Sequence, residues 1–98
     1  MKFPVVTLIR SESNRTTESR RRSFVVEASS IQMAIHKAII DVEKENPVKI
    51  LLAHNKKIYL WDERKMQLHR VNDFQDAKTL ACVSMVGDLM DLEARLKS

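Results

Sequence analysis

Four arginines lie within eight residues near the start of this sequence, and their side chains have the clearest chemical capacity in it. They are Arg15, Arg20, Arg21 and Arg22. A guanidinium group stays charged at any working pH and makes forked hydrogen bonds to carboxylates and phosphates. This cluster therefore predicts a surface that binds an anionic partner.

The net charge of the chain is confined to the same region. Residues 1–24 contain six Lys or Arg and two Asp or Glu, which gives +4, whereas residues 25–98 contain eleven of each kind and sum to zero. Segregated charge gives one surface a field that attracts anions while the rest of the protein stays neutral. This pattern also indicates a binding surface. The alternative is that the arginines only keep a long loop in water or pair with acidic groups nearby.

An aromatic pair is the second candidate for recognition. Tyr59 and Trp61 are two residues apart, so in a strand they share one face, and Lys56 and Lys57 precede them. An exposed pair can stack on nucleic-acid bases or anchor a protein partner. Burial of both rings under a helix is the more ordinary outcome, and we expect it here.

Residues with catalytic or metal-binding capacity are too scattered to form a recognisable motif. His36, His54 and His69 are widely spaced, and a lone Cys82 excludes an internal disulfide and a multi-cysteine zinc site. Gly87 is the only glycine, whereas loops that cradle phosphates need several. We therefore expect no catalytic residues, no metal and no cofactor, and a protein that is not an enzyme.

Composition and length favour one folded domain over residues 1–98. Apolar residues make up 44% of the chain and charged residues 31%, as in folded soluble proteins. The apolar run at residues 5–9 is short, and none approaches the roughly 20 residues of a membrane span. A cytoplasmic protein without a membrane partner is the expectation.

The first half of the chain predicts two strands and a helix. Residues 3–10 and 22–28 are rich in β-branched and apolar residues, and the polar residues 11–21 between them predict a hairpin with arginines at its tip. Ser29 and Gln32 have the spacing of a capping box at the start of a helix. The helix has one apolar stripe, made of Ile31, Ala34, Ile35, Ala38 and Val42.

The second half predicts three short strands and a helix. Residues 48–53 and 58–61 flank a polar turn, and residues 66–71 add a third strand. Residues 73–97 carry apolar residues every three or four positions through Gly87, which favours one long helix over a strand at 79–86 followed by a short helix. The predicted fold is α+β, a two-layer sandwich of order ββαβββα whose mainly antiparallel sheet has both helices against one face.

The last predicted helix is more apolar than one stripe requires. Leu80, Val83, Val86 and Met90 lie outside its main stripe. A small domain hardly buries so much surface internally, so we expect a homodimer or a docked partner to cover it, or else a central helix wrapped by the sheet.

These observations predict a small non-enzymatic protein-binding regulator or inhibitor. Its basic hairpin and apolar helix surface would dock on a protein partner with an acidic surface. The alternative is a nucleic-acid-binding module that uses the same arginines with Lys56, Lys57, Tyr59 and Trp61.

Overall fold

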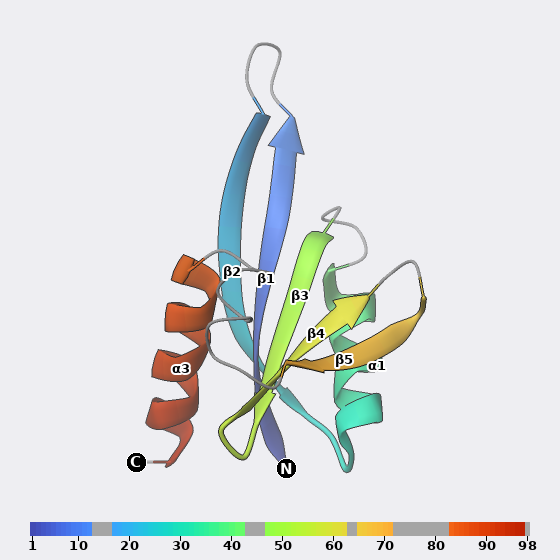
Figure 1. The fold of residues 1–98 in the computed structure, drawn as a ribbon, viewed down its shortest axis with the longest axis vertical. Helices are drawn as coiled ribbons and strands as arrows, with labels where there is room; N and C mark the ends of the chain where they lie inside the picture. Colours follow the sequence, from blue (N-terminus) through green and yellow to red (C-terminus); the bar gives the residue numbers. More distant parts are fainter. Residues whose placement is uncertain (13–16, 43–46, 63–64, 72–82, 98) are drawn as a thin grey trace.

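The computed structural model describes residues 1–12, 17–42, 47–62, 65–71 and 83–97, and these form an antiparallel sheet and two helices (Figure 1). The elements are β1 (Lys2–Glu12), β2 (Thr17–Glu27), α1 (Ile31–Val42), β3 (Pro47–His54), β4 (Lys57–Asp62), β5 (Gln67–Val71) and α3 (Val83–Lys97). The strands lie in the order β2-β1-β3-β4-β5. The predicted α+β class and the order ββαβββα are confirmed.

The two helices cover opposite faces of the sheet, which corrects the expected two-layer arrangement. In β1, Phe3 and Val5 pack in a cluster with α1, whereas Val6 packs in a second cluster with α3. In β3, Leu52 belongs to the first cluster and Leu51 to the second. Neighbouring residues of a strand point to opposite faces, so the protein has three layers, helix, sheet and helix. We call the two sides of the sheet the α1 face and the α3 face.

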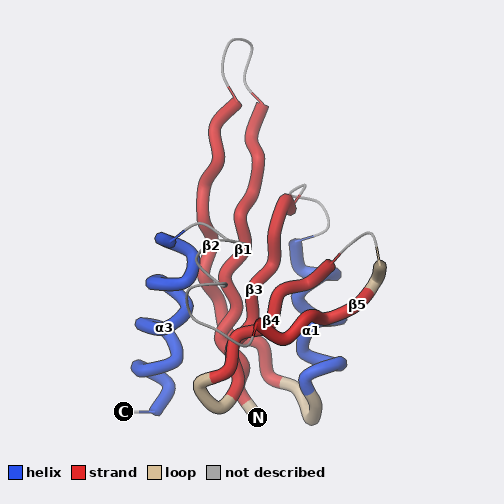
Figure 2. The backbone as a smooth tube through the Cα atoms, in the orientation of Figure 1, coloured by secondary structure: helices blue, strands red, loops and turns tan. Residues whose placement is uncertain are grey.

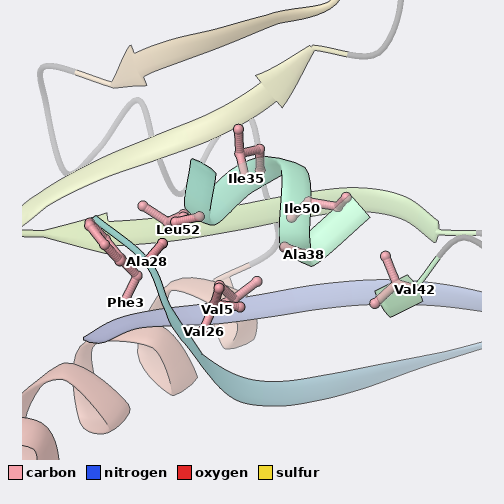
Figure 3. Close-up of a cluster of buried hydrophobic side chains, with 10 residues drawn as sticks. Phe3, Val5, Val26, Ala28, Ile35, Ala38, Val42, Ile50 and Leu52 are labelled. Atoms are coloured by element: carbon pink, nitrogen blue, oxygen red, sulfur yellow. The ribbon is translucent and has the colours of Figure 1, made fainter. Parts of the chain in front are cut away.

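The sequence contains a signal for this arrangement in its central strands. Strands that are buried on both faces are continuously apolar, whereas strands with one wet face alternate. Residues 3–6 and 50–53 are continuously apolar, and all of them are buried. Figure 3 shows the α1-face cluster, in which side chains of β1, β2 and β3 meet the buried stripe of α1. The equivalent cluster on the α3 face contains Val6, Leu51, Ala53, Ile58, Met85, Val86 and Leu89.

Thr7 is a polar residue inside this apolar sheet. It is fully buried in β1, and its hydroxyl oxygen has no hydrogen-bond partner among the described residues. A buried hydroxyl that lacks a partner costs roughly 1–3 kcal/mol. We expect Thr7→Val to raise the free energy of unfolding by about 1 kcal/mol in urea denaturation, because valine keeps the shape and removes the hydroxyl. Thr7→Ser, which keeps the hydroxyl and removes the methyl group, should lower it; a less stable valine variant would contradict this account.

Helix α1 begins one residue later than the capping prediction. The Ser30 hydroxyl oxygen accepts a hydrogen bond of 3.2 Å from the Met33 N–H, so Ser30 is the N-cap, and the predicted pair of Ser29 and Gln32 is wrong by one position. The predicted stripe is confirmed. Ala34, Ile35, Ala38 and Val42 are buried, and Ile31 is partly buried against the same cluster.

The turn between β3 and β4 is a tight two-residue connection. His54 pairs with Lys57, and the two residues between them, Asn55 and Lys56, have φ angles of 51° and 64°. Positive φ at both central positions is the signature of a type I′ turn, whose twist matches that of the flanking strands. The predicted hairpin is confirmed, and its turn lies at the end of the sheet where β1 begins (Figure 1).

Helix α3 confirms the apolar stripe through Gly87. Met85 and Leu89 of the predicted stripe are buried on either side of Gly87 and Leu92 is half-buried, whereas Leu96 is exposed. Residues 83–86 are helical, so the alternative of a strand reaching Val86 is wrong there. The rest of the predicted helix, residues 73–82, lies outside the described residues, as do Leu80 and Cys82.

Gly87 weakens this helix, and no neighbouring atom requires a glycine at this position. It is exposed, and a Cβ added to it would meet no atom within 4 Å. Alanine in a helix interior is roughly 0.5–1 kcal/mol more favourable than glycine. We expect Gly87→Ala to raise the free energy of unfolding by that amount and the Tm by roughly 2–8 °C in a thermal melt. Gly87→Pro should destabilise the protein by about 3 kcal/mol, since it breaks the helix. A lower Tm for the alanine variant would contradict the exposed position.

Candidate functional site

The hairpin of β1 and β2 extends beyond the rest of the sheet. The pairing of β1 with β2 begins at Lys2, which lies opposite Glu27, and continues to Glu12, which lies opposite Thr17. The pairing of β3 with β1 reaches only Ile9. Among the described residues, 10–12 and 17–19 thus pair only with each other, and Figures 1 and 2 show this two-stranded segment projecting from the molecule. We call it the arm. Its projection makes it accessible to a partner.

The prediction of a loop over residues 11–21 is wrong for the residues that the structure describes. Residues 11–12 and 17–21 belong to β1 and β2, so Arg20 and Arg21, which were expected in the loop, are in a strand. Residues 17–21 have no apolar alternation, so the usual sequence pattern of a strand is missing, and backbone pairing with β1 defines this part of β2.

The arginines are divided between the two faces of the sheet. Arg20, Arg21 and Arg22 lie in β2 at the base of the arm, opposite Ile9, Leu8 and Thr7. Phe24 packs in the α1-face cluster, so by alternation Arg20 and Arg22 lie on the α1 face and Arg21 lies on the α3 face. Arg15 lies outside the described residues.

Arg21 is held by an ion pair with helix α3. Its Nε lies 3.3 Å from Oδ2 of Asp88, and both side chains are partly exposed. An exposed pair of this kind contributes about 0–1 kcal/mol, so its main effect is to orient the guanidinium. Asp88 also lowers the positive potential on this side of the strand.

On the α1 face, Arg22 lies over an aromatic ring. Its guanidinium carbon is 5.0 Å from the centroid of Phe24, two residues further along the strand, which is a cation–π contact. Arg20 is exposed and Arg22 is half-buried. The α1 face at the base of the arm therefore presents two cations.

The aromatic pair and the two lysines lie elsewhere. Tyr59 and Trp61 share one face as predicted, and both are half-buried against the α1-face cluster. Lys56 and Lys57 are exposed in the β3–β4 turn, at the end of the sheet opposite the arm. The structure does not bring these residues together with the arginines into one surface.

Three residues of the predicted apolar surplus of the last helix, Val83, Val86 and Met90, lie within the described part of α3, and they differ in burial. Val86 is buried and Met90 is half-buried in the α3-face cluster, whereas Val83 is 61% exposed. The second apolar face of the sheet, which the two-layer prediction lacked, covers Val86 and Met90.

The sequence patterns did not predict that one carboxylate is buried. Glu93 in α3 is buried, and its Oε2 accepts a hydrogen bond of 3.4 Å from the Lys56 N–H in the β3–β4 turn. It borders an open pocket of about 310 Å³ that Pro4, Ala53, His54 and Leu96 also line. The signal available in the sequence was its position four residues after Leu89 of the predicted apolar stripe, because residues four apart share a helix face. Glu93 joins the helix to the turn.

The described residues contain no group of three or more His, Cys, Asp or Glu side chains that can hold a metal ion. His36 and His69 are exposed, and His54 is half-buried with its ring centroid 5.0 Å from that of Phe3. No helix in the described part of the chain has the length and hydropathy needed to cross a membrane.

The chain was compared with models of known protein families, with curated proteins and with solved structures, and none of the three comparisons gave a match.

Proposed function

We propose that this protein is a small protein-binding regulator or inhibitor that docks through its basic hairpin on an acidic surface of a partner protein. One observation carries the proposal: a hairpin that projects past β3 presents arginines on both faces at the base of its arm. A projecting two-sided ribbon can enter a cleft of a partner and meet carboxylates on either wall. The fixed orientation of Arg21 and Arg22 lowers the conformational entropy lost on binding.

The same geometry favours a protein partner over nucleic acid. Binding along a phosphate backbone needs cations that follow one surface, and aromatic residues beside them if bases are to stack. Here the arginines are divided between two faces of the sheet. Tyr59 and Trp61 are half-buried, and the lysines lie at the other end of the sheet.

The test is affinity capture from a cell lysate with and without nuclease. The bait would be wild type, the variant Arg20→Glu/Arg22→Glu, and the control Lys56→Glu/Lys57→Glu, which has the same change in net charge at the opposite end of the protein. We expect a defined protein partner that survives nuclease, is lost with the arginine variant and is kept by the control.

Two outcomes would overturn the proposal. The first is a partner that binds the arginine variant as well as it binds wild type. The second is retention of nucleic acid by wild type, with every captured protein lost after nuclease, which would establish the nucleic-acid-binding alternative.

A further inference from the structure

We propose that the free edge of β2 binds an extended acidic segment of a partner protein, which pairs with β2 as an antiparallel strand. This inference depends on the proposed function and specifies its binding mode. β2 ends the strand order of the sheet, so one side of its backbone has no neighbouring strand among the residues that the structure describes. An exposed sheet edge can accept a strand from another chain, with backbone hydrogen bonds supplying affinity and side chains supplying specificity.

The hydrogen bonds at the base of the hairpin define which backbone groups face the free edge. Met1 and Ala28 exchange two bonds, of 3.0 Å from the Met1 terminal amine to the Ala28 oxygen and of 2.9 Å from the Ala28 N–H to the Met1 oxygen. Hydrogen-bonded and non-bonded pairs alternate along an antiparallel ladder. Even-numbered residues of β2 therefore bond to β1, and the odd-numbered Arg21, Ser23 and Val25 direct their N–H and C=O groups outward.

A contact from α1 supports this assignment independently. The Lys37 ammonium group donates a hydrogen bond of 2.7 Å to the backbone oxygen of Glu27, another odd-numbered residue of β2. A carbonyl that is bonded to β1 would not face outward in this way. Lys37 also occupies that end of the edge, so an added strand pairs from Val25 toward the arm.

The side chains beside these groups specify the sequence of the added strand. Arg20 and Arg22 lie on the α1 face, Arg21 lies on the α3 face, and Val25 is 40% exposed. Opposite charges and apolar pairs directly across two strands are stabilising. An antiparallel segment thus needs an apolar residue across from Val25, two residues of any kind, and then three successive acidic residues across from Arg22, Arg21 and Arg20.

A second copy of this chain fits the edge less well than an acidic segment. Pairing of β2 with itself would bring two sets of Arg20, Arg21 and Arg22, six guanidinium groups in all, onto adjacent strands. Like charges across neighbouring strands are destabilising, whereas acidic residues at these positions are complementary.

A labelled synthetic peptide tests the inference. Its central sequence would be Val-Thr-Thr-Glu-Glu-Glu, and a peptide of the same composition in scrambled order would be its control. We expect fluorescence anisotropy to show at least tenfold tighter binding of the ordered peptide. In the complex, hydrogen exchange at the Ser23 and Val25 amides should slow at least tenfold.

The matched variants are Ser23→Pro and Ser23→Ala. At position 23, proline removes the backbone N–H that faces the free edge, and edge strands tolerate proline at such a position. Alanine keeps this N–H and serves as the control. We expect the proline variant to bind the ordered peptide at least tenfold more weakly and the alanine variant to bind within twofold of wild type. Circular dichroism and sedimentation of each variant check that it folds and remains the size of wild type.

The outcomes distinguish this inference from the proposed function. Binding that is lost in Arg20→Glu/Arg22→Glu but unchanged in Ser23→Pro would overturn strand addition and leave the basic docking surface intact. No binding of the ordered peptide at roughly 1 mM would overturn strand addition directly. A concentration-dependent dimer that the proline variant abolishes would also overturn it, since a second copy would then occupy the edge.

Discussion

Replacing either Leu51 or Leu52 with alanine is expected to destabilise the protein by roughly 2–5 kcal/mol. Both side chains are fully buried, Leu51 in the α3-face cluster and Leu52 in the α1-face cluster. Each truncation removes apolar area and leaves a cavity in a close-packed core. Because domains of this size are stable by about 5–15 kcal/mol, either change would remove a large part of the total.

This pair of variants tests the three-layer arrangement. A sheet with one wet face would tolerate one of two adjacent leucines as alanine, whereas a sheet covered on both faces tolerates neither. Ile40→Ala is the control, because Ile40 is 70% exposed on α1 and its truncation should cost less than about 0.5 kcal/mol. Urea denaturation of the three variants would give the free energies. A mild effect at either leucine would contradict burial on both faces.

The second large effect is expected on binding. Arg20→Glu/Arg22→Glu should weaken the complex with the captured partner by at least about 100-fold, because each charge-assisted hydrogen bond contributes roughly 1.5–3 kcal/mol and reversal adds repulsion. The affinity of wild type should fall as salt rises, and that dependence should be smaller in the variant. Titration calorimetry at two salt concentrations measures both.

The folded state should hardly change in this double variant. Arg20 is exposed, and loss of the Arg22 contact with Phe24 should cost about 0.5–1 kcal/mol. Arg21→Glu differs, since it would place a carboxylate beside Asp88 and repel it. If the double variant keeps its Tm and still binds with the affinity of wild type, the basic surface does not hold the partner.

Local patterns were sufficient for most elements. The stripe of α1 repeats every three or four residues, and the polar turn between two apolar runs predicted the β3–β4 hairpin, because helix and strand periods are local properties of a chain. The class and the order of elements followed from these patterns. The concentration of arginines before residue 23 was likewise visible in the sequence.

The arm shows where local patterns fail. Residues 17–21 have no apolar alternation, and they form a strand because β1 supplies hydrogen-bond partners along their whole length. The pairing also decides that Arg20 and Arg22 share a face while Arg21 meets Asp88, far away in the sequence. Side-chain periodicity in one segment carries no record of its neighbour in space, so this separation of charge could not be derived from it.

The sequence by itself determined the class of fold, the order of the elements and the confinement of net charge to the first quarter of the chain. Only the tertiary structure decided that the helices cover opposite faces, that Glu93 is buried against the β3–β4 turn, and that Arg21, Ser23 and Val25 face an open edge. The physical reason is that periodicity and composition are properties of single segments, whereas faces, edges and ion pairs depend on which segments become neighbours.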